Sequence, residues 1–385
     1  MSAVTWTDVK KPHIPGESRL SPIPPGLRRA IARVEFAVGR HGESAKRAAP
    51  SAGACYPYEL LLSPAGAAVF GLADLARRTF FTRRTDRHWW DAQEFGCFLV
   101  GRPWLTMRKY GRRGYFYHLL DAGHAVLNLS VAAAGTRVPD RRSVSAVAGE
   151  AVARGGVLLA AGVLDGSGQH EDPDHWLMHE TAASSIHPPL GDIERTMTDL
   201  LPPTPDPLLL RHLDRPELAG AIAGRRSAAG LAGTVAAGLV REVVQQSMDL
   251  CRQVIPSYGL PLPDVRVFAR GELPGPDWLS AALVGQRNLV DASTFVVVHA
   301  RVADTARQAL SPATQRLAMA GGIAGEILYL VAGRAGVGVT GIGGFDPGRW
   351  ARLCGTEDDV LYVLGLGRAA SVGKIDVTSV DGNHG

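Results

Sequence analysis

The chain has 385 residues, of which 46% are hydrophobic and 20% are charged, and its formal net charge at pH 7 is +4. This is the balance of a globular protein that can bury a large core, and the length is sufficient for about two or three domains. The basic residues gather in short arginine clusters and form no stripe interleaved with aromatic residues, which argues against a protein that binds DNA or RNA.

Nothing in the sequence indicates export or a membrane span. Residues 1–18 are polar and lack the apolar core of a signal peptide. The apolar runs at residues 123–135 and 321–333 are too short to cross a bilayer. The four cysteines are widely spaced and form no CxxC motif, a pattern typical of a reduced, cytosolic protein; they are Cys55, Cys97, Cys251 and Cys354. We therefore expect a cytoplasmic protein that does not associate with membranes.

The first part of the chain divides into an arm and a folded half. Residues 1–28 are rich in proline and are expected to form the N-terminal arm, and residues 29–167 form the first half. The predicted elements are, in chain order, a helix at 27–39, strands at 58–62 and 96–101, a helix at 116–134 that stops at Gly135, and a strand at 156–164.

A change of composition marks the border of a second half. Residues 168–218 are enriched in Asp, His, Pro and Thr and are expected to form a linker. Residues 219–371 form the second half, and residues 372–385 a C-terminal tail. The predicted elements of the second half are a helix at 234–254, a strand at 294–299, a helix at 313–333 and a strand at 360–368.

The two halves look like an internal repeat. Residues 122–135 align without a gap with residues 320–333, so that Gly123 matches Gly321, because both runs have Ala-Gly at each end. The Pro-Ser-x-Gly motif at 50–53 has a weaker echo at 256–259. Two helices rich in Gly and Ala can match by composition alone, but the order helix, Pro-Ser-x-Gly loop, strand, Ala-Gly helix and strand recurs in both halves.

Two segments of the first half carry the clearest functional signal. Residues 47–57 read Arg-Ala-Ala-Pro-Ser-Ala-Gly-Ala-Cys-Tyr-Pro, a loop of small residues that a ligand can approach closely. Further along, Lys109-Tyr110-Gly111 supplies two adjacent titratable side chains. Together the segments resemble the hallmark of SagB-type dehydrogenases, a branch of the FMN-dependent nitroreductase family. Those enzymes oxidise azoline rings in ribosomally made peptides to thiazoles and oxazoles. Cys55 departs from the pattern, which has a bulky apolar residue there.

The resemblance implies an α+β fold. It would be a nitroreductase-like fold duplicated in one chain as an intrachain pseudo-dimer, with antiparallel or mixed sheets flanked by helices. Enzymes of this family build each flavin pocket from two subunits, and this chain divides the corresponding motifs between its own halves. The resemblance therefore implies FMN as the cofactor, in one site per chain at the contact between the halves.

The implied FMN-binding residues come from both halves. In the second half, Arg225 and Arg226 offer planar donors for the phosphate, Arg368 adds another, and Ser227 can bind a phosphate or ribityl oxygen. Gly343 and Gly344 let a backbone N–H approach the flavin ring, because no Cβ intervenes. The residues implied in the first half are Arg47, Pro50, Ser51, Ala52, Gly53 and Asn128. A buried helix amide is an equal alternative for Asn128.

Lys109 and Tyr110 are the implied catalytic residues. Azoline oxidation removes a proton from one ring carbon and a hydride from its neighbour, so a base that works near neutral pH is needed. Arg108, Arg112 and Arg113 surround the pair in sequence and could favour a phenolate or a neutral amine. The sequence leaves open which of the two residues is the base. A solvated basic loop is the alternative interpretation of the segment.

The sequence gives weaker signals about metals and about partners. His170, His175 and His179 could hold a metal, but an exposed polar linker explains them better, and we expect no metal. The implied substrate is a modified precursor peptide. A cyclodehydratase or another leader-binding protein is a possible partner, since no peptide-recognition domain precedes the first helix. An NAD(P)H-dependent nitroreductase or ene-reductase and a decayed scaffold subunit of a peptide-modifying complex are the alternative functions.

Overall fold

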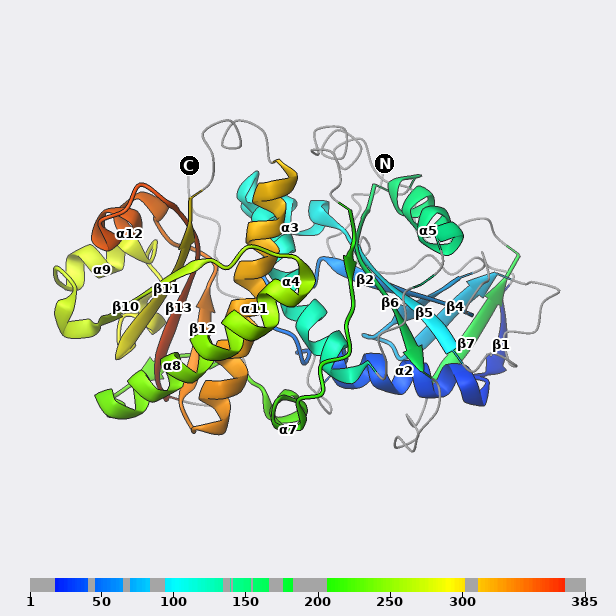
Figure 1. Cartoon of the computed structure of the whole chain (residues 1–385), viewed down its shortest axis with the longest axis horizontal. Helices are drawn as coiled ribbons and strands as arrows, with labels where there is room; N and C mark the ends of the chain where they lie inside the picture. Colours follow the sequence, from blue (N-terminus) through cyan, green and yellow to red (C-terminus); the bar gives the residue numbers. More distant parts are fainter. Residues whose placement is uncertain are drawn as a thin grey trace, which may run out of the picture.

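The computed structural model of the chain contains two β-sheets that lie on either side of a central pair of helices (Figure 1). The structure describes residues 18–40, 46–64, 70–83, 94–133, 139, 141–153, 155–165, 176–182, 206–301 and 311–370. The expected C-terminal tail lies outside the described residues, as do most of the expected N-terminal arm and the greater part of the expected linker.

The first sheet has eight strands in the order β1-β7-β4-β3-β2-β5-β6-β8. The β4–β7 and β6–β8 pairs are parallel and the other pairs are antiparallel. The strands are β1 (Ser18–Pro22), β2 (Tyr58–Pro64), β3 (Gly71–Asp74), β4 (Thr79–Arg83), β5 (Glu94–Gly101), β6 (Val157–Asp165), β7 (Leu177–Thr181) and β8 (Leu208–Leu209).

Helices cover both faces of this sheet. Helices α2 (Pro25–Val38) and α4 (Arg113–Ala132) pack on one face, and α5 (Arg141–Ala153) packs on the other. Successive side chains of a strand point to opposite faces, and the centre of β2 shows the consequence. Leu60 and Leu62 belong to the core beneath α2 and α4, whereas Leu61 belongs to the separate core beneath α5. The middle of β2 is therefore apolar on both sides.

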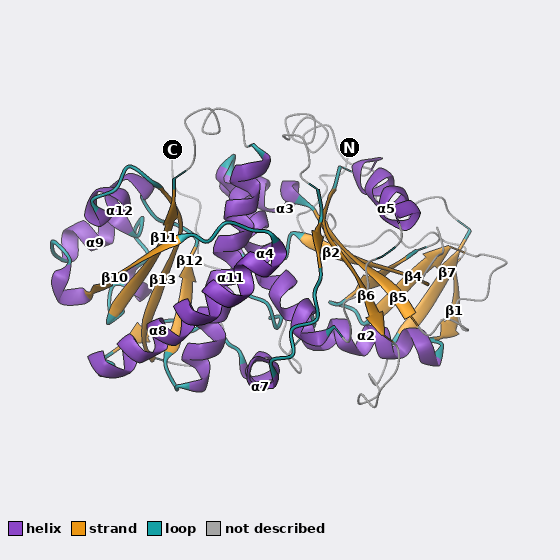
Figure 2. Cartoon of the chain, in the orientation of Figure 1, coloured by secondary structure: helices purple, strands orange, loops and turns teal. Residues whose placement is uncertain are grey.

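The second sheet is antiparallel, with the order β10-β11-β13-β12, and β9 pairs with the end of β13. Its strands are β9 (Leu231–Ala232), β10 (Asp264–Ala269), β11 (Thr294–Ala300), β12 (Gly338–Ile342) and β13 (Asp359–Ala369). Helices α8 (Ala237–Val254) and α11 (Pro312–Arg334) lie on the side facing the first half, and α9 (Pro276–Ala282) and α12 (Pro347–Cys354) lie on the outer side (Figure 2).

The two halves share one order of elements. The series α2-β2-β5-α4-β6 in the first half corresponds to α8-β10-β11-α11-β13 in the second. In both halves the three strands are neighbours in that order and antiparallel. The pairing is irregular between Leu99 and Val100 in the first sheet and between Val298 and His299 in the second. The irregularities therefore match Leu99 with Val298, whereas the gapless sequence alignment would match Leu99 with Val297. The structural correspondence is shifted by a single position.

Helices α4 and α11 pack against each other and form the contact between the halves, which we call the seam (Figure 1). They approach most closely where Gly123 meets Gly322. A Cβ on Gly123 would lie 2.9 Å from Gly322 Cα, and a Cβ on Gly322 would lie 3.0 Å from Gly123 Cα and would also overlap the Leu120 carbonyl oxygen. The pairing of Gly123 with Gly322 is shifted by one position from the sequence alignment, as is the pairing of the strand irregularities. Equivalent positions of the two repeats therefore meet where the helices cross.

Helix α11 is long and apolar enough to span a membrane by length and composition, unlike the shorter apolar run considered in the sequence. Within the structure it is mostly buried, between α4, α8 and the second sheet. Its sequence begins with Ser311, which caps the helix by accepting a hydrogen bond from the Thr314 N–H, followed by Pro312 at the first helical position. Burial among protein elements is what a core helix of this composition requires.

The expected domain borders differ from the structure at two places. Strand β1 lies in the expected arm, and β7 and β8 lie in the expected linker, yet all three belong to the first sheet. Strand β1 pairs with β7, and β7 pairs with β4, so two distant segments extend that sheet edge. The first half is therefore completed by chain on both sides of residues 29–167. Helix α7 (Pro216–Gly224) then leads into the second half.

Candidate functional site

The loop at residues 51–56 is fastened to helix α4 by a buried carboxylate. Ser51 Oγ donates a hydrogen bond to Asp121 Oδ2 at 2.6 Å, and the Ala52 N–H donates to Oδ1 of the same side chain at 3.1 Å. The Tyr56 N–H in turn donates to Ser51 Oγ at 2.7 Å. The Ser51 hydroxyl and the Ala52 N–H thus form hydrogen bonds within the protein, and these bonds fix the loop to α4.

Loop 51–56 has an unusual backbone. Gly53, Ala54 and Tyr56 have positive φ angles of 57°, 52° and 45°. A residue with a side chain rarely adopts this region, so Ala54 and Tyr56 are strained. At Gly53 the space is also occupied, because a Cβ there would overlap Lys109 Nζ and Tyr110 Oη. The structure therefore brings the loop and the Lys-Tyr pair, which are far apart in sequence, into direct contact.

Lys109 and Tyr110 lie in the last turn of the short helix α3 (Pro103–Tyr110). The helix ends at Gly111, whose φ of 58° reverses the chain into α4. Lys109 is exposed and Tyr110 is half-buried. The Tyr110 ring packs edge-on against Tyr117 of α4, with 5.0 Å between the ring centroids.

Burial raises the pKa of Tyr110 well above that of a free phenol, and Cys55, Asp121 and Tyr117 raise it further. This differs from the expectation that neighbouring arginines favour a phenolate. Arg113 instead donates to the Phe345 carbonyl at 2.7 Å and stacks on the Phe345 ring at 4.0 Å. At neutral pH Tyr110 is a neutral phenol, which makes it a hydrogen-bond donor rather than a base.

The Gly-Gly-Phe turn of the second half lies against this part of the first half. Tyr117 donates a hydrogen bond to the Gly343 carbonyl, and Gln286 Nε2 donates to the Gly344 carbonyl at 2.5 Å. Among the residues that the structure describes, a Cβ on Gly343 would meet no atom within 4 Å. The turn is thus held by its carbonyl groups, and the space beside the Gly343 Cα is open.

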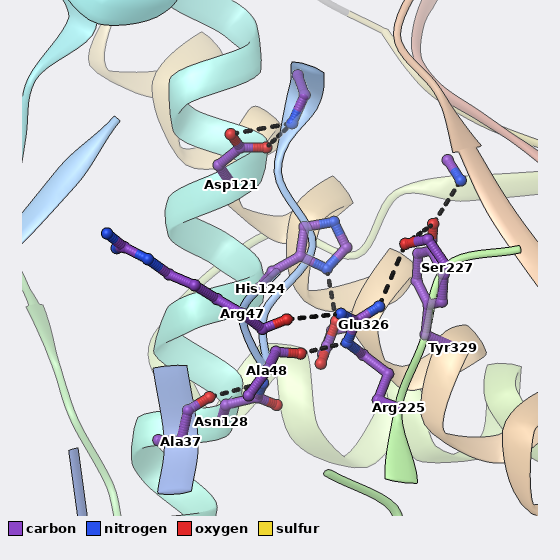
Figure 3. A network of polar contacts seen from close by, with 12 residues as sticks. Ala37, Arg47, Ala48, Asp121, His124, Asn128, Arg225, Ser227, Glu326 and Tyr329 are labelled. Atoms are coloured by element: carbon purple, nitrogen blue, oxygen red, sulfur yellow. Dashed lines mark hydrogen bonds and ion pairs between the residues drawn. The ribbon is translucent and has the colours of Figure 1, made fainter. Parts of the chain in front are cut away.

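Arg225 is buried and spans the seam. Its Nη2 donates to the Arg47 carbonyl at 2.8 Å, its Nε donates to the Ala48 carbonyl, and its Nη1 donates to Ser227 Oγ at 3.3 Å (Figure 3). Two of its guanidinium nitrogens therefore join the second half to the loop that precedes Pro50, and the third binds Ser227 within the second half. This placement does not favour the predicted role of Arg225 as a phosphate ligand. Likewise, the Arg47 guanidinium stacks on the Tyr56 ring at 4.4 Å.

Arg226 and Arg368 are the predicted phosphate ligands that the structure leaves exposed. Arg226 donates to two backbone carbonyls of its own segment, those of Ala223 and Arg225. Strand β9 follows shortly after Ser227 and pairs with β13 so that Ala232 lies opposite Arg368. The two arginines therefore come from adjoining segments at one end of the second sheet.

Asn128 and His124 lie on the buried face of α4. Asn128 Nδ2 donates to the Ala37 carbonyl of α2 at 3.1 Å, so it joins two helices of the first half, which does not favour the predicted contact with the cofactor. His124 Nδ1 lies 2.9 Å from Glu326 Oε2 of α11, and both side chains are fully buried at the seam. Burial lowers the pKa of His124, although Glu326 opposes this shift.

Sequence reasoning missed the roles of Arg113, Tyr117, Asp121 and Glu326. The signal for three of them was present, because Arg113, Tyr117, Asp121, His124 and Asn128 recur at three- and four-residue intervals along α4. Side chains at that spacing share one face of a helix, so a polar stripe on an otherwise apolar helix indicates a buried polar interface. Glu326, alone in an apolar stretch of α11, gave no such pattern.

The predicted histidine cluster is mostly outside the described residues, which exclude His170 and His175. His179 lies on β7 and stacks on Phe81. Elsewhere Asp264, His299 and Asp358 bring one potential ligand atom each within 4.8 Å of one another. His299 Nδ1 pairs with Asp358 at 2.8 Å, an arrangement that proteins also use without a metal, and the expectation of no metal stays a prediction.

Comparison with known proteins identifies the fold. Residues 228–368 match the family model described as Nitroreductase family. A candidate nitroreductase from Anabaena variabilis is similar over 94% of this chain and 95% of its own, with 15% identity and a TM-score of 0.58. No curated protein matches the chain. The expected nitroreductase-like α+β fold is thereby confirmed, and the match to the family model lies in the second half of the chain.

Two shorter structural similarities involve less than half of the chain. Nitroreductase A from Vibrio parahaemolyticus has 16% identity and a TM-score of 0.34, over 41% of this chain and 70% of its own. A candidate nitroreductase in complex with FMN from Exiguobacterium sibiricum has 16% identity and a TM-score of 0.32, over 42% of this chain and 91% of its own.

Proposed function

We propose that this chain, which matches the nitroreductase family model at residues 228–368, is an FMN-dependent oxidoreductase with one flavin site per chain at the seam. The observation that carries the proposal is the meeting of three predicted motifs from both halves. Gly53 contacts the Lys109-Tyr110 pair, and Tyr110 packs on Tyr117, whose hydroxyl holds the Gly343 carbonyl. The FMN found with the Exiguobacterium sibiricum protein supports the choice of cofactor.

The residues present fit FMN. Arg226 and Arg368 offer exposed guanidinium groups for its phosphate, whereas the Ser227 hydroxyl already accepts from Arg225 and donates to Tyr329 Oη. Strand β12 leads from this corner, where Gly338 pairs with Gly367, to the turn at Gly343. The open space beside Gly343 suits a flat ring, because no Cβ projects there. Both ends of an elongated nucleotide therefore have partners at the two ends of one strand.

When bound, FMN supplies a two-electron acceptor that takes a hydride from the substrate. The residues of the chain handle the accompanying proton. Because Tyr110 is kept neutral by burial, we assign its Oη the role of hydrogen-bond donor that orients the substrate ring. Proton removal then falls to Lys109, which acts as the base in its neutral amine form and whose Nζ lies beside Gly53.

The substrate we propose is an azoline ring in a ribosomally made peptide, oxidised to a thiazole or oxazole in the cytoplasm with oxygen as the final electron acceptor. The proposal rests on the resemblance of residues 47–57 and 109–111 to SagB-type dehydrogenases. The exposure of Lys109 supports a large substrate such as a peptide, since this member of the pair is accessible from the surface. A cyclodehydratase or leader-binding protein would then deliver the precursor peptide.

The test is an oxidation assay with the full chain loaded with FMN and an azoline-containing peptide. Lys109→Ala should lower turnover by about a hundredfold or more, the usual contribution of a positioned base, while the FMN content stays unchanged. Arg112→Ala is the matched control, because Arg112 is an exposed cation close to Lys109 in sequence. Full activity of Lys109→Ala would refute the catalytic assignment. Reduction of the flavin by NAD(P)H with no azoline oxidation would favour a small-molecule reductase, and a chain that binds no FMN would favour a scaffold.

A further inference from the structure

Asp121 is a buried carboxyl group for which the proposed reaction has no use. It is 4% exposed, and its two oxygens accept hydrogen bonds from the Ser51 hydroxyl and the Ala52 N–H. These two donors begin loop 51–56, the segment that places Gly53 against Lys109 and Tyr110.

The loop needs such an anchor because its backbone is strained. Ala54 and Tyr56 hold positive φ angles, and strained residues persist only where their surroundings fix them. On the far side of the loop, the Arg47 N–H donates to Tyr56 Oη at 2.8 Å. On the near side, the anchor is Asp121, directly and through the Ser51 oxygen that accepts the Tyr56 N–H.

We propose that Asp121 is a positioning residue of this site, and that its carboxyl group in the protonated form holds loop 51–56 closed against Lys109 and Tyr110. The functional meaning rests on the proposed role of the Lys-Tyr pair. A neutral carboxyl can keep both contacts, because it accepts from the Ala52 N–H and can donate its proton to Ser51 Oγ, whose oxygen has a second lone pair beside the Tyr56 N–H.

The direction of the pH effect follows from burial. Burial raises the pKa of Asp121 to about 7, outweighing the hydrogen bonds from Ser51 and Ala52, which lower it. When the loop opens and water reaches the carboxyl, its pKa returns toward about 4. Between these two pKa values, the Asp121 carboxyl is protonated when the loop is closed and ionised when the loop is open. Low pH therefore favours the closed loop. Opening therefore becomes easier as the pH rises from about 4 to about 7 and changes little above that.

Most of the other titratable groups near Asp121 are tyrosines, which stay neutral through this range. Tyrosines face it from α3, loop 51–56, β2 and β13, and burial raises the pKa of each of them; they are Tyr110, Tyr56, Tyr58 and Tyr362. His124 lies one turn further along α4. Burial lowers its pKa, and its Nδ1 pairs with the carboxylate of Glu326 on α11. The buried cation Arg225 is held by the carbonyls of Arg47 and Ala48.

Amide hydrogen exchange of the full chain, measured from pH 5 to pH 8 without cofactor or substrate, tests the proposal. After correction for intrinsic exchange rates, protection of residues 51–56 in the wild type should fall by at least about tenfold between pH 5 and pH 7. In Asp121→Asn, a neutral mimic of the protonated carboxyl, protection should stay high at every pH and exceed that of the wild type at pH 7.5. Asp74→Asn is the control, since Asp74 caps a distant turn at Ala76, and it should behave as the wild type.

A wild-type protection profile that is flat between pH 5 and pH 7 would overturn the proposal, as would an Asp121→Asn profile that keeps the wild-type slope. If Asp121→Asn does not fold, Ser51→Ala provides the second variant. It removes one contact of the carboxyl and leaves the titrating group, so protection should drop at every pH while the slope remains; loss of the slope would also overturn the proposal. Because no FMN is present, these outcomes are independent of whether the proposed reaction is correct.

Discussion

At Gly53 two requirements coincide in one residue. Its backbone has a left-handed conformation with φ of 57°, and the position of its missing Cβ is filled by Lys109 Nζ and Tyr110 Oη. Glycine satisfies both, since it adopts positive φ without strain and leaves the space free. Both atoms that a side chain would displace are ends of flexible side chains, so the cost of substitution should fall on the site rather than on the fold.

Gly53→Ala should therefore lower azoline oxidation by more than about tenfold, because the two reactive groups must move, while unfolding becomes easier by only about 1–2 kcal/mol. Gly259→Ala is the matched control: Gly259 has φ of 68°, and a Cβ there meets no atom of the described part of the chain within 4 Å. Steady-state oxidation and denaturant unfolding of both variants measure the two effects. Equal activity in the two variants would contradict the packing of Gly53 on the pair.

At this scale the sequence could predict which residues gather but not what each one binds. The motifs at Gly53, Lys109, Tyr110 and Gly343 are recognisable as patterns, and the structure places them around α4. Arg225 and Arg226 are indistinguishable in sequence, yet one is buried against two carbonyls and the other is exposed. Burial depends on the whole fold, so the sequence could not separate them.

Among the elements, the crossing of α4 and α11 decides how the two halves fit together. The Gly123–Gly322 contact lets the helix backbones approach closely, and the matching irregularities of the two sheets follow the same shifted correspondence. Gly321, which the sequence alignment pairs with Gly123, faces Leu120 and Leu361 side chains at 3.3 Å or more. The structure thus distinguishes two neighbouring glycines of α11 that the repeat pattern treats alike.

Gly322→Ala should destabilise the protein by about 1–3 kcal/mol, because its Cβ would overlap backbone atoms of α4 that cannot move independently. Gly321→Ala, in the same helix, should cost much less, since ordinary side chains are its neighbours. The free energies of unfolding in urea give the comparison. If Gly321→Ala were the more damaging change, the helices would cross where Gly123 meets Gly321, as the sequence alignment pairs them.

The long, strongly patterned elements could be predicted from the sequence. The observed elements that lie within a few residues of the expected ranges are α2, α4, α8, α11, β2, β5, β6, β11 and β13. The short strands β1, β7 and β8 could not, because such short segments carry little periodicity and become strands by pairing with distant partners. The first sheet therefore extends beyond residues 29–167, the range expected for the first half.

For the molecule as a whole, the repeat and the division of motifs lead to one asymmetric assembly. The second half supplies the Gly-Gly-Phe turn, Arg226 and Arg368, and the first half supplies loop 51–56 and the Lys-Tyr pair. Arg225 and the His124–Glu326 pair join the halves through buried polar contacts. Leaving such groups unpaired is costly, which favours a fixed seam over two independently moving halves.

The central claim, one flavin site at this seam, is tested most directly by the visible absorption spectrum of the purified full chain, with the released cofactor identified and counted after denaturation. We predict a yellow protein that releases one FMN per chain. Two FMN per chain would contradict the asymmetric division of motifs. A colourless protein that FMN cannot reconstitute would contradict the proposed function altogether.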